Sequence, residues 1–229
     1  MENTEFYKTT NENQIANYSG ICANYFGYIT NGFVVDVGAH DGYTWSNSYP
    51  LISAGWNGIL FEPHPMYANK IRELYKNRSP NDVIIIEKAL SNYKGEAILY
   101  DAISLTTLKT EMLDAYEQIE WAKGRYQNKT FNVKIDKLDD MLYENNVKPN
   151  FEVFTLDCEG SEEEVLECFD LKYWKPKMVI VEALEQKPDY ERSILDMKGG
   201  NFYKFCDDLF IGNGYKKTYV DSVNTIYVL

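Results

Sequence analysis

The sequence predicts an α/β protein whose mostly parallel β-sheet ends in an antiparallel hairpin. Short runs rich in Val, Ile and Phe alternate with longer stretches of helical period, which is the pattern of βαβ units. Each run is almost entirely apolar, as expected for a strand that helices cover on both faces. The last residues, GYKKTYVDSVNTIYVL, hold two alternating segments that are too close together for a helical connection, so they predict a hairpin.

The expected elements follow one another along the chain. The apolar runs predict strands at residues 33–37, 58–61, 83–86, 151–156 and 178–181. Apolar residues at helical spacing predict helices at residues 66–76, 138–146 and 161–169. The last helix begins with Ser161 and Glu164 in S-x-x-E spacing, which predicts a capping box between these side chains. We therefore expect Ser161 to cap the helix rather than to act as a nucleophile.

A single domain accounts for the length of the chain. Its 229 residues are 45% apolar, which is enough to bury one full core. We expect an N-terminal arm or helix over residues 1–30 and one domain over residues 31–229. Residues 100–130 interrupt the regular alternation and are interpreted as a variable insertion. Within this insertion, one apolar helix face is predicted by the spacing of Leu108, Met112, Tyr116 and Ile119.

Composition and charge argue against several classes of partner. The formal charge is −12 and no run of Lys or Arg occurs, so we expect no nucleic acid and no membrane surface as partner. Residues 1–20 contain no apolar core of a signal peptide, and no apolar run approaches the length of a membrane-spanning helix. The cysteines show no C-x-x-C spacing. These observations predict a cytoplasmic protein and leave a homo-oligomer open.

An aspartate precedes a glycine turn in the stretch VVDVGAHDGYTWSNS. Asp36 ends the first predicted strand, and Gly38 and Gly42 follow, with Ala39 and His40 between them. The turn lacks the G-x-G-x-x-G of dinucleotide sites and the GK[ST] ending of a P-loop. A carboxylate here would repel a pyrophosphate but attract an ammonium or a sulfonium, and backbone N–H groups of the turn would bind a carboxylate. These are groups of S-adenosylmethionine, which the stretch predicts as the ligand.

The next two strands supply further candidate contacts to the same ligand. Glu62 ends the second strand in GILFEPHP, where an acid can accept hydrogen bonds from both ribose hydroxyls. After the third strand, IIIEKALS would bring Ala89 and Leu90 beside the adenine. Together these positions predict a nucleoside site along the carboxyl edge of the sheet.

Four segments resemble the FkbM-type methyltransferase family. They are VDVGAHDG, LFEPHP, KALSNYKGEA and LDCEGSEEEVL, and the last resembles the family's I-D-x-E-G-[AS]-E-x-x-V-L element, with IDKLDDML before it. The resemblance covers about residues 32–182. It implies a Rossmann-like class I methyltransferase fold with a seven-stranded, mostly parallel sheet, S-adenosylmethionine as methyl donor, and methylation of a hydroxyl on a sugar, glycan or other small metabolite. It also implies that residues 100–130 lie on the substrate side.

Two positions depart from the usual pattern of these enzymes. Cys158 stands where the family usually has an aliphatic residue, and His40 stands where many other methyltransferases have a middle glycine. The bulkier turn makes His40 and the nearby Asn47 further candidate contacts to the cofactor.

Acidic residues gather where the reaction would take place. Asp157, Glu159 and Glu162 follow the fourth strand, and Glu182 ends the fifth. Methyl transfer to a hydroxyl needs alignment and removal of a proton, which a carboxylate beside other acids can accept. We assign Asp157 as the first candidate for the base or acceptor-orienting residue and Glu159 as the second. Oxygen ligands also suit a divalent cation, but the metal-free mechanism is preferred and no metal is expected.

Other side chains and other functions stay open at this level. His40 and His64 follow strands and can shuttle a proton, and Trp45, Trp121, Tyr116 and Tyr126 can stack on a sugar, although core packing is expected for most of them. The main alternative to an O-methyltransferase is an accessory protein that binds S-adenosylmethionine without turnover. An NAD(P)-dependent oxidoreductase is a weaker alternative, because the dinucleotide turn is missing.

Overall fold

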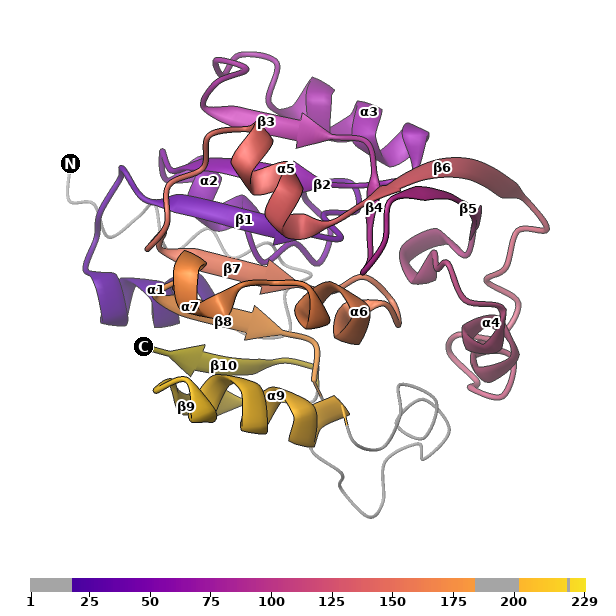
Figure 1. Cartoon of the computed structure of the whole chain (residues 1–229). Helices are drawn as coiled ribbons and strands as arrows, with labels where there is room; N and C mark the ends of the chain where they lie inside the picture. Colours follow the sequence, from indigo (N-terminus) through magenta and orange to yellow (C-terminus); the bar gives the residue numbers. More distant parts are fainter. Residues whose placement is uncertain (1–17, 184–201, 222) are drawn as a thin grey trace.

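A computed structural model describes residues 18–183, 202–221 and 223–229 of the chain. Its central sheet is formed by β1 (Phe33–Val37), β2 (Asn57–Phe61), β3 (Val83–Ile86), β7 (Val153–Leu156), β8 (Met178–Val181), β9 (Lys216–Val220) and β10 (Thr225–Val228). The strand order is β3-β2-β1-β7-β8-β10-β9 (Figure 1). The first five strands in this order are parallel, whereas β10 pairs antiparallel with both β8 and β9. The predicted fold, a mostly parallel seven-stranded sheet with a C-terminal antiparallel hairpin, is confirmed.

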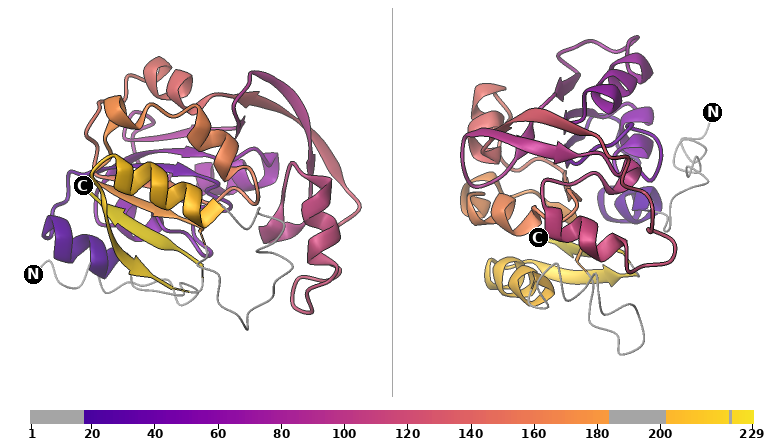
Figure 2. Two further views of the ribbon diagram at one scale, coloured as in Figure 1. Left: turned by 60° about the horizontal axis from the view of Figure 1, so that its bottom comes forward. Right: turned by 90° about the vertical axis from the view of Figure 1, so that its right-hand side faces the viewer.

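Helices cover both faces of this sheet, as Figures 1 and 2 show. One face carries α5 (Leu138–Glu144), α6 (Glu162–Glu167), α7 (Leu171–Trp174) and α9 (Phe202–Gly212), and the other carries α1 (Tyr18–Phe26), α2 (Tyr49–Ser53) and α3 (Pro65–Leu74). Side chains alternate along β1, so Val35 and Val37 enter the first core and Val34 enters the second. Asp36 therefore points toward the layer that contains α2, which matters for the site.

The N-terminal helix α1 packs on the second core. Cys22 is buried there, and the Phe26 ring lies edge-on to Trp56 at a centroid distance of 5.8 Å. The Tyr25 hydroxyl donates a hydrogen bond of 2.7 Å to the carbonyl of Leu229, which ties α1 to the end of β10. The polar arm expected before this helix lies outside the described residues.

A second, three-stranded sheet extends from the carboxyl edge of the central one (Figure 1). It contains β4 (Ala89–Leu90), β5 (Gly95–Tyr100) and β6 (Thr130–Asp136) in the order β4-β6-β5. The sequence pattern predicts none of these strands, because β4 has two residues and polar side chains interrupt β5 and β6. Between β5 and β6 lie the short helix η2 (Ile103–Leu105) and α4 (Thr110–Tyr116).

The apolar helix predicted in the insertion is shorter than its sequence pattern. Met112 and Tyr116 are buried on α4, as expected, and Ile119 is buried just beyond the helix end. Leu108 instead packs against the small sheet, because it precedes the first turn of α4. These contacts build a separate apolar cluster under the insertion.

The predicted capping box at α6 is wrong. Ser161 is the N-cap residue but its side chain makes no capping hydrogen bond. Glu164 forms an ion pair with Lys109 instead of turning back to the cap. The Glu162 carboxylate accepts hydrogen bonds from the N–H groups of Cys158 and Gly160, at 3.0 and 2.9 Å. The turn before the helix is therefore fixed by the carboxylate of Glu162, the residue after the N-cap, and not by a capping box.

Two further findings concern the chain as a whole. Within the described residues, each helix is too short or too polar to cross a membrane. All four cysteines are free thiols, with Cys22 and Cys206 buried.

Candidate active site

One cavity of about 440 Å³ lies at the carboxyl ends of the parallel strands. Nearly all the candidate site residues line it, namely Asp36, Gly38, Ala39, His40, Asn47, Glu62, Ala89, Leu90, Asp157 and Glu159. Gly42 is the exception: it does not line the cavity, and its carbonyl accepts a hydrogen bond from the Tyr75 hydroxyl at 3.5 Å. The cavity is within the size range of small-molecule sites.

Asp36 is a buried carboxylate at the end of β1. Its side chain is 4% exposed, and it accepts a hydrogen bond from the Ser48 hydroxyl just before α2. Burial raises the pKa of Asp36 to about 6, and the bond from Ser48 opposes part of this rise. A cationic ligand would restore the ionised form by supplying the missing opposite charge.

Gly38 lets the turn after β1 pass close to the turn after β7. Its φ is +89°, and a Cβ at this position would lie 1.7 Å from the carbonyl oxygen of Asp157. The N–H groups of Gly38 and Ala39 both donate to the Phe61 carbonyl, at 3.0 and 3.1 Å. These two groups are therefore hydrogen-bonded within the protein, and binding of a ligand carboxylate by N–H groups of this turn stays a prediction.

Glu62 is held by the backbone on both sides of its carboxylate. The His40 N–H donates to Oε2 at 2.8 Å and the His64 N–H donates to Oε1 at 2.7 Å. Burial raises the pKa of Glu62 to about 8, although these two hydrogen bonds lower it. Each carboxylate oxygen has a second lone pair, so the acid can still accept from a ligand hydroxyl.

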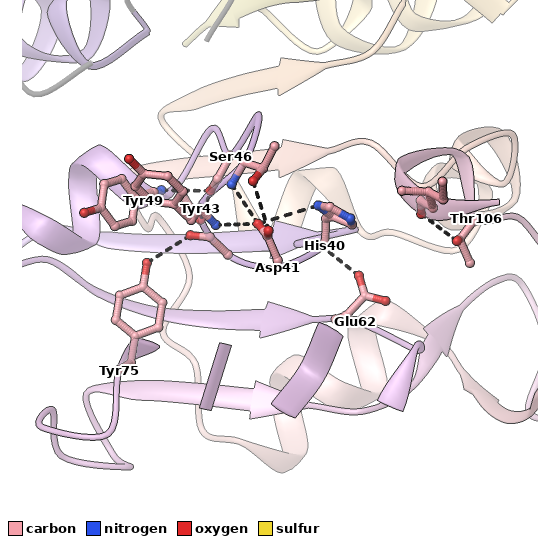
Figure 3. Close-up of polar contacts among 12 residues, drawn as sticks. His40, Asp41, Tyr43, Ser46, Tyr49, Glu62, Tyr75 and Thr106 are labelled. Carbon is pink, nitrogen blue, oxygen red and sulfur yellow. Dashed lines mark hydrogen bonds and ion pairs between the residues drawn. The ribbon is translucent and has the colours of Figure 1, made fainter. Parts of the chain in front are cut away.

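His40 adopts a left-handed conformation in the turn, with φ of +51°. Its imidazole packs on the Tyr67 ring at 4.1 Å and its Nδ1 lies 3.6 Å from the Asp41 carboxylate (Figure 3). Asp41 in turn accepts the N–H groups of Tyr43 and Thr44 at 3.0 and 2.7 Å, which fixes the rest of the turn. The structure thus places the His40 side chain on the cavity wall.

His64, by contrast, serves the start of α3. Its Nδ1 accepts the Met66 N–H at 3.2 Å, so the proton of the neutral ring sits on Nε2, which lies 3.5 Å from the Asp101 carboxylate. Burial lowers the pKa of His64. This side chain is 1% exposed and does not line the cavity, so the structure gives it no role in proton transfer.

Asn47, Ala89 and Leu90 complete the wall expected around the nucleoside. The Asn47 amide donates to the Thr155 hydroxyl on β7 at 3.1 Å. Ala89 and Leu90 form β4 and are both buried, in register with the end of β6. They present an apolar surface to the cavity.

Three acids from the ends of β7 and β8 converge in the same cavity. One carboxylate oxygen from each of Asp157, Glu159 and Glu182 lies within 4.8 Å of the others. The Tyr116 hydroxyl donates to Glu159 at 2.6 Å, which links α4 to this group. Glu162 is not part of the group, because its carboxylate is bonded to the backbone. Such a cluster suits removal of a proton, and its oxygens also match the ligand preferences of a hard divalent cation.

Residues 36–216, which are more than half of the chain, match the protein-family model described as the methyltransferase FkbM domain. The chain belongs to the FkbM methyltransferase family. No curated protein matches it.

Solved structures also resemble this FkbM family member. One is the methyltransferase FkbM from Methylobacillus flagellatus, at 13% identity and a TM-score of 0.49, with 99% of this chain and 59% of that chain covered. Another is the precorrin-6Y C5,15-methyltransferase from Geobacter metallireducens, at 12% identity and a TM-score of 0.45, with 96% and 92% covered. This chain therefore spans about three fifths of the Methylobacillus structure.

Several polar residues of the FkbM site are not predicted by the sequence motifs. Ser48 holds Asp36, Thr155 holds Asn47, and Lys88 lines the cavity while pairing with Asp136 at 2.9 Å. The signal for Ser48 was present, because SNSYP is typical of a helix start with proline in the first turn. Nothing in the local sequence pointed to Thr155, which looks like an ordinary strand residue.

Proposed function

We propose that this FkbM family member is an S-adenosylmethionine-dependent O-methyltransferase that acts on a hydroxyl of a small acceptor, such as a sugar or glycan. The main observation behind the proposal is that one cavity contains two separate groups of acidic side chains. Asp36 and Glu62 are buried at the ends of β1 and β2, and Asp157 and Glu159 belong to the cluster at the ends of β7 and β8. The first pair suits a cationic nucleoside, and the second suits an acceptor.

The residues at the β1 and β2 edge fit the methyl donor. Asp36 would bind its ammonium group, Glu62 would accept hydrogen bonds from the ribose hydroxyls, and Ala89 and Leu90 would pack against the adenine. His40 and Asn47 lie on the same wall. When bound, S-adenosylmethionine supplies an electrophilic methyl group.

The acid cluster would prepare the acceptor. Asp157 is the first candidate to accept the proton of the hydroxyl, and Glu159, held by Tyr116, is the second. Aligning the hydroxyl is the larger part of the task, because the sulfonium is already reactive. We place the metal-free mechanism first, and full activity in excess chelator would support it. Activity that chelator removes and magnesium restores would assign the cluster to a cation instead.

Transfer of a labelled methyl group tests the proposal. Wild-type protein is incubated with methyl-labelled S-adenosylmethionine and a panel of sugars, sugar acids and sugar phosphates, and each product is identified by mass. We expect Asp157→Asn to bind the donor as tightly as wild type but to lose at least about a hundredfold in turnover, the lower end for a general base or acid. Full activity of that variant would contradict the assignment of Asp157. Donor binding with no transfer to any acceptor would favour an accessory protein.

The partners and compartment follow from charge and cysteine chemistry. A chain of formal charge −12 is repelled by nucleic acid, so a small acceptor is proposed in its place. Four free thiols are compatible with the reducing cytoplasm, where we place the protein.

A further inference from the structure

A guanidinium lies at the rim of the cavity, outside the groups assigned so far. Arg125 follows α4 and lines the cavity together with Trp121. Its Nε donates to the Trp121 carbonyl at 3.2 Å, and its guanidinium carbon lies 5.9 Å from the centroid of the Trp121 ring. The indole is 49% exposed. The two side chains therefore form a platform with a cation on one part and an aromatic face on the other.

The charge of Arg125 is not neutralised within the described residues. The other Lys or Arg on the cavity wall, Lys88, pairs with Asp136 at 2.9 Å, whereas Arg125 forms no ion pair with any described carboxylate. Among the described residues, its two terminal nitrogens make no hydrogen bond, and only Nε donates one. Because the chain carries a net charge of −12, carboxylates outnumber cations, and a guanidinium with no carboxylate beside it is unusual in this protein.

The cavity is also polarised. Asp157, Glu159 and Glu182 come from the ends of β7 and β8, whereas Arg125 comes from the insertion that Figure 2 shows projecting from the sheet. An anionic group is repelled by the three acids and attracted by the guanidinium. A hydroxylated molecule with one anionic group would therefore enter with its hydroxyl toward the acids and its anion toward Arg125.

We propose that Arg125 binds an anionic group of the acceptor while Trp121 packs against its sugar ring, so that the substrates are sugar acids or sugar phosphates rather than neutral sugars. The inference rests on the proposed function, because it names the substrate class of the same cavity. The planar guanidinium matches a carboxylate or a phosphate with two parallel hydrogen bonds. The Trp121 face packs against the apolar face of the sugar ring.

Binding to protein saturated with S-adenosylhomocysteine tests this inference. Glucose 1-phosphate and glucuronate are titrated by calorimetry beside the neutral methyl glucoside, so the phosphate and the carboxylate are separate arms. At least one anionic probe is expected to bind about tenfold more tightly than methyl glucoside, a difference of about 1.4 kcal/mol. Whichever arm shows the gain identifies the anion.

Variants locate the effect. Arg125→Gln is expected to lose about tenfold in affinity for the anionic probe, a difference of about 1.4 kcal/mol, and to keep its affinity for methyl glucoside. Arg125→Lys retains the charge but loses the planar fork, so its affinity lies between the two. Lys123→Gln is the matched control, because this exposed lysine lies on the same turn but not on the cavity wall, and it should bind as wild type does.

The outcomes separate this inference from the proposed function. Equal affinity for anionic and neutral probes, absence of binding by both anions, or an unchanged Arg125→Gln variant each overturns the anionic acceptor. Titration of S-adenosylhomocysteine alone is the independent readout, and both wild type and Arg125→Gln should bind it equally. Failure of wild type to bind it would count against the proposed function itself.

Discussion

Gly38 is the glycine at which the neighbouring backbone leaves the least space for a side chain. Because a Cβ there would lie 1.7 Å from the Asp157 carbonyl oxygen, Gly38→Ala must push the turns after β1 and β7 apart. We expect a loss in the free energy of unfolding of more than about 4 kcal/mol, which is exceptional for one substitution. Gly214→Ala is the control, since Gly214 has a φ of +92° but no atom within 4 Å of the added Cβ.

Urea unfolding of both variants measures the difference. Gly214→Ala should lose only about 1–2 kcal/mol, the cost of a left-handed backbone for a residue with a Cβ. Similar losses in the two variants would mean that backbone conformation alone, and not the close approach to Asp157, requires Gly38.

Glu62 makes stability depend on pH. Its ordinary pKa of 4.5 is raised by burial to about 8, so the folded protein holds this proton more tightly than the unfolded chain does. The contribution of the group to stability is therefore complete below pH 4.5, falls as the pH rises, and is lost above about pH 8. Within this window, one proton changes the free energy of unfolding by at most about 1.4 kcal/mol per pH unit.

The variant Glu62→Gln removes this proton. Unfolding by urea at pH 5.5 and pH 8.5 should show a smaller difference between the two pH values than in wild type. The free energy of unfolding of this variant is expected to fall at both pH values as well. The NH₂ group of the new side-chain amide would face a backbone N–H of His40 or His64, so that two donors meet and one hydrogen bond is lost. The exposed Glu120→Gln serves as control, and a Glu62→Gln variant with the full wild-type difference would contradict the assignment.

At the scale of elements, the turn before α6 can be stabilised either by hydrogen bonds to the Glu162 carboxylate or by a capping hydrogen bond of Ser161. The Glu162 carboxylate accepts hydrogen bonds from Cys158 and Gly160, whereas the Ser161 side chain makes no capping bond. Glu162→Ala leaves two partly buried N–H groups without this partner and should destabilise the protein by about 1–3 kcal/mol. Ser161→Ala removes a buried hydroxyl without breaking a capping hydrogen bond, so it should cost less, under about 0.5 kcal/mol, the lower end for one hydrogen bond.

Thermal unfolding of the two variants decides between the observed arrangement and a capping box. A loss of about 1 kcal/mol for Ser161→Ala, with little effect of Glu162→Ala, would restore the S-x-x-E interpretation. The expected order is the reverse.

The elements differ in how well their sequences predict them. The parallel strands β1, β2, β7 and β8 are buried almost throughout and β3 is partly buried, so their continuous apolar runs predict them with nearly correct bounds. The small sheet is not predicted, because β5 is exposed or half-buried along most of its length and β4 gains its partner, β6, from a distant segment. The candidate cofactor residues could be predicted from acid and glycine positions beside strands. Arg125 and Thr155 could not be assigned in this way, since their surroundings depend on tertiary packing.

At the scale of the whole molecule, the three layers and the insertion create one cavity from distant segments. The end of β1 supplies Asp36 and the turn after β2 supplies Glu62. The turns after β7 and β8 supply the acid cluster, and the segment after α4 supplies Arg125. The parallel sheet is what aligns these turns, because its strands end at a common edge. The FkbM family match extends over all of them.

The measurement that tests this account most directly is calorimetric titration of S-adenosylmethionine into wild type, Asp36→Asn and Asp114→Ala. The first substitution removes the buried charge with little change in shape, and the second removes an exposed aspartate outside the cavity. We predict saturable binding of one molecule per chain by wild type and Asp114→Ala, and affinity at least about tenfold lower in Asp36→Asn. Absence of binding by wild type, or equal binding by Asp36→Asn, would contradict the claim that this cavity binds the methyl donor through Asp36.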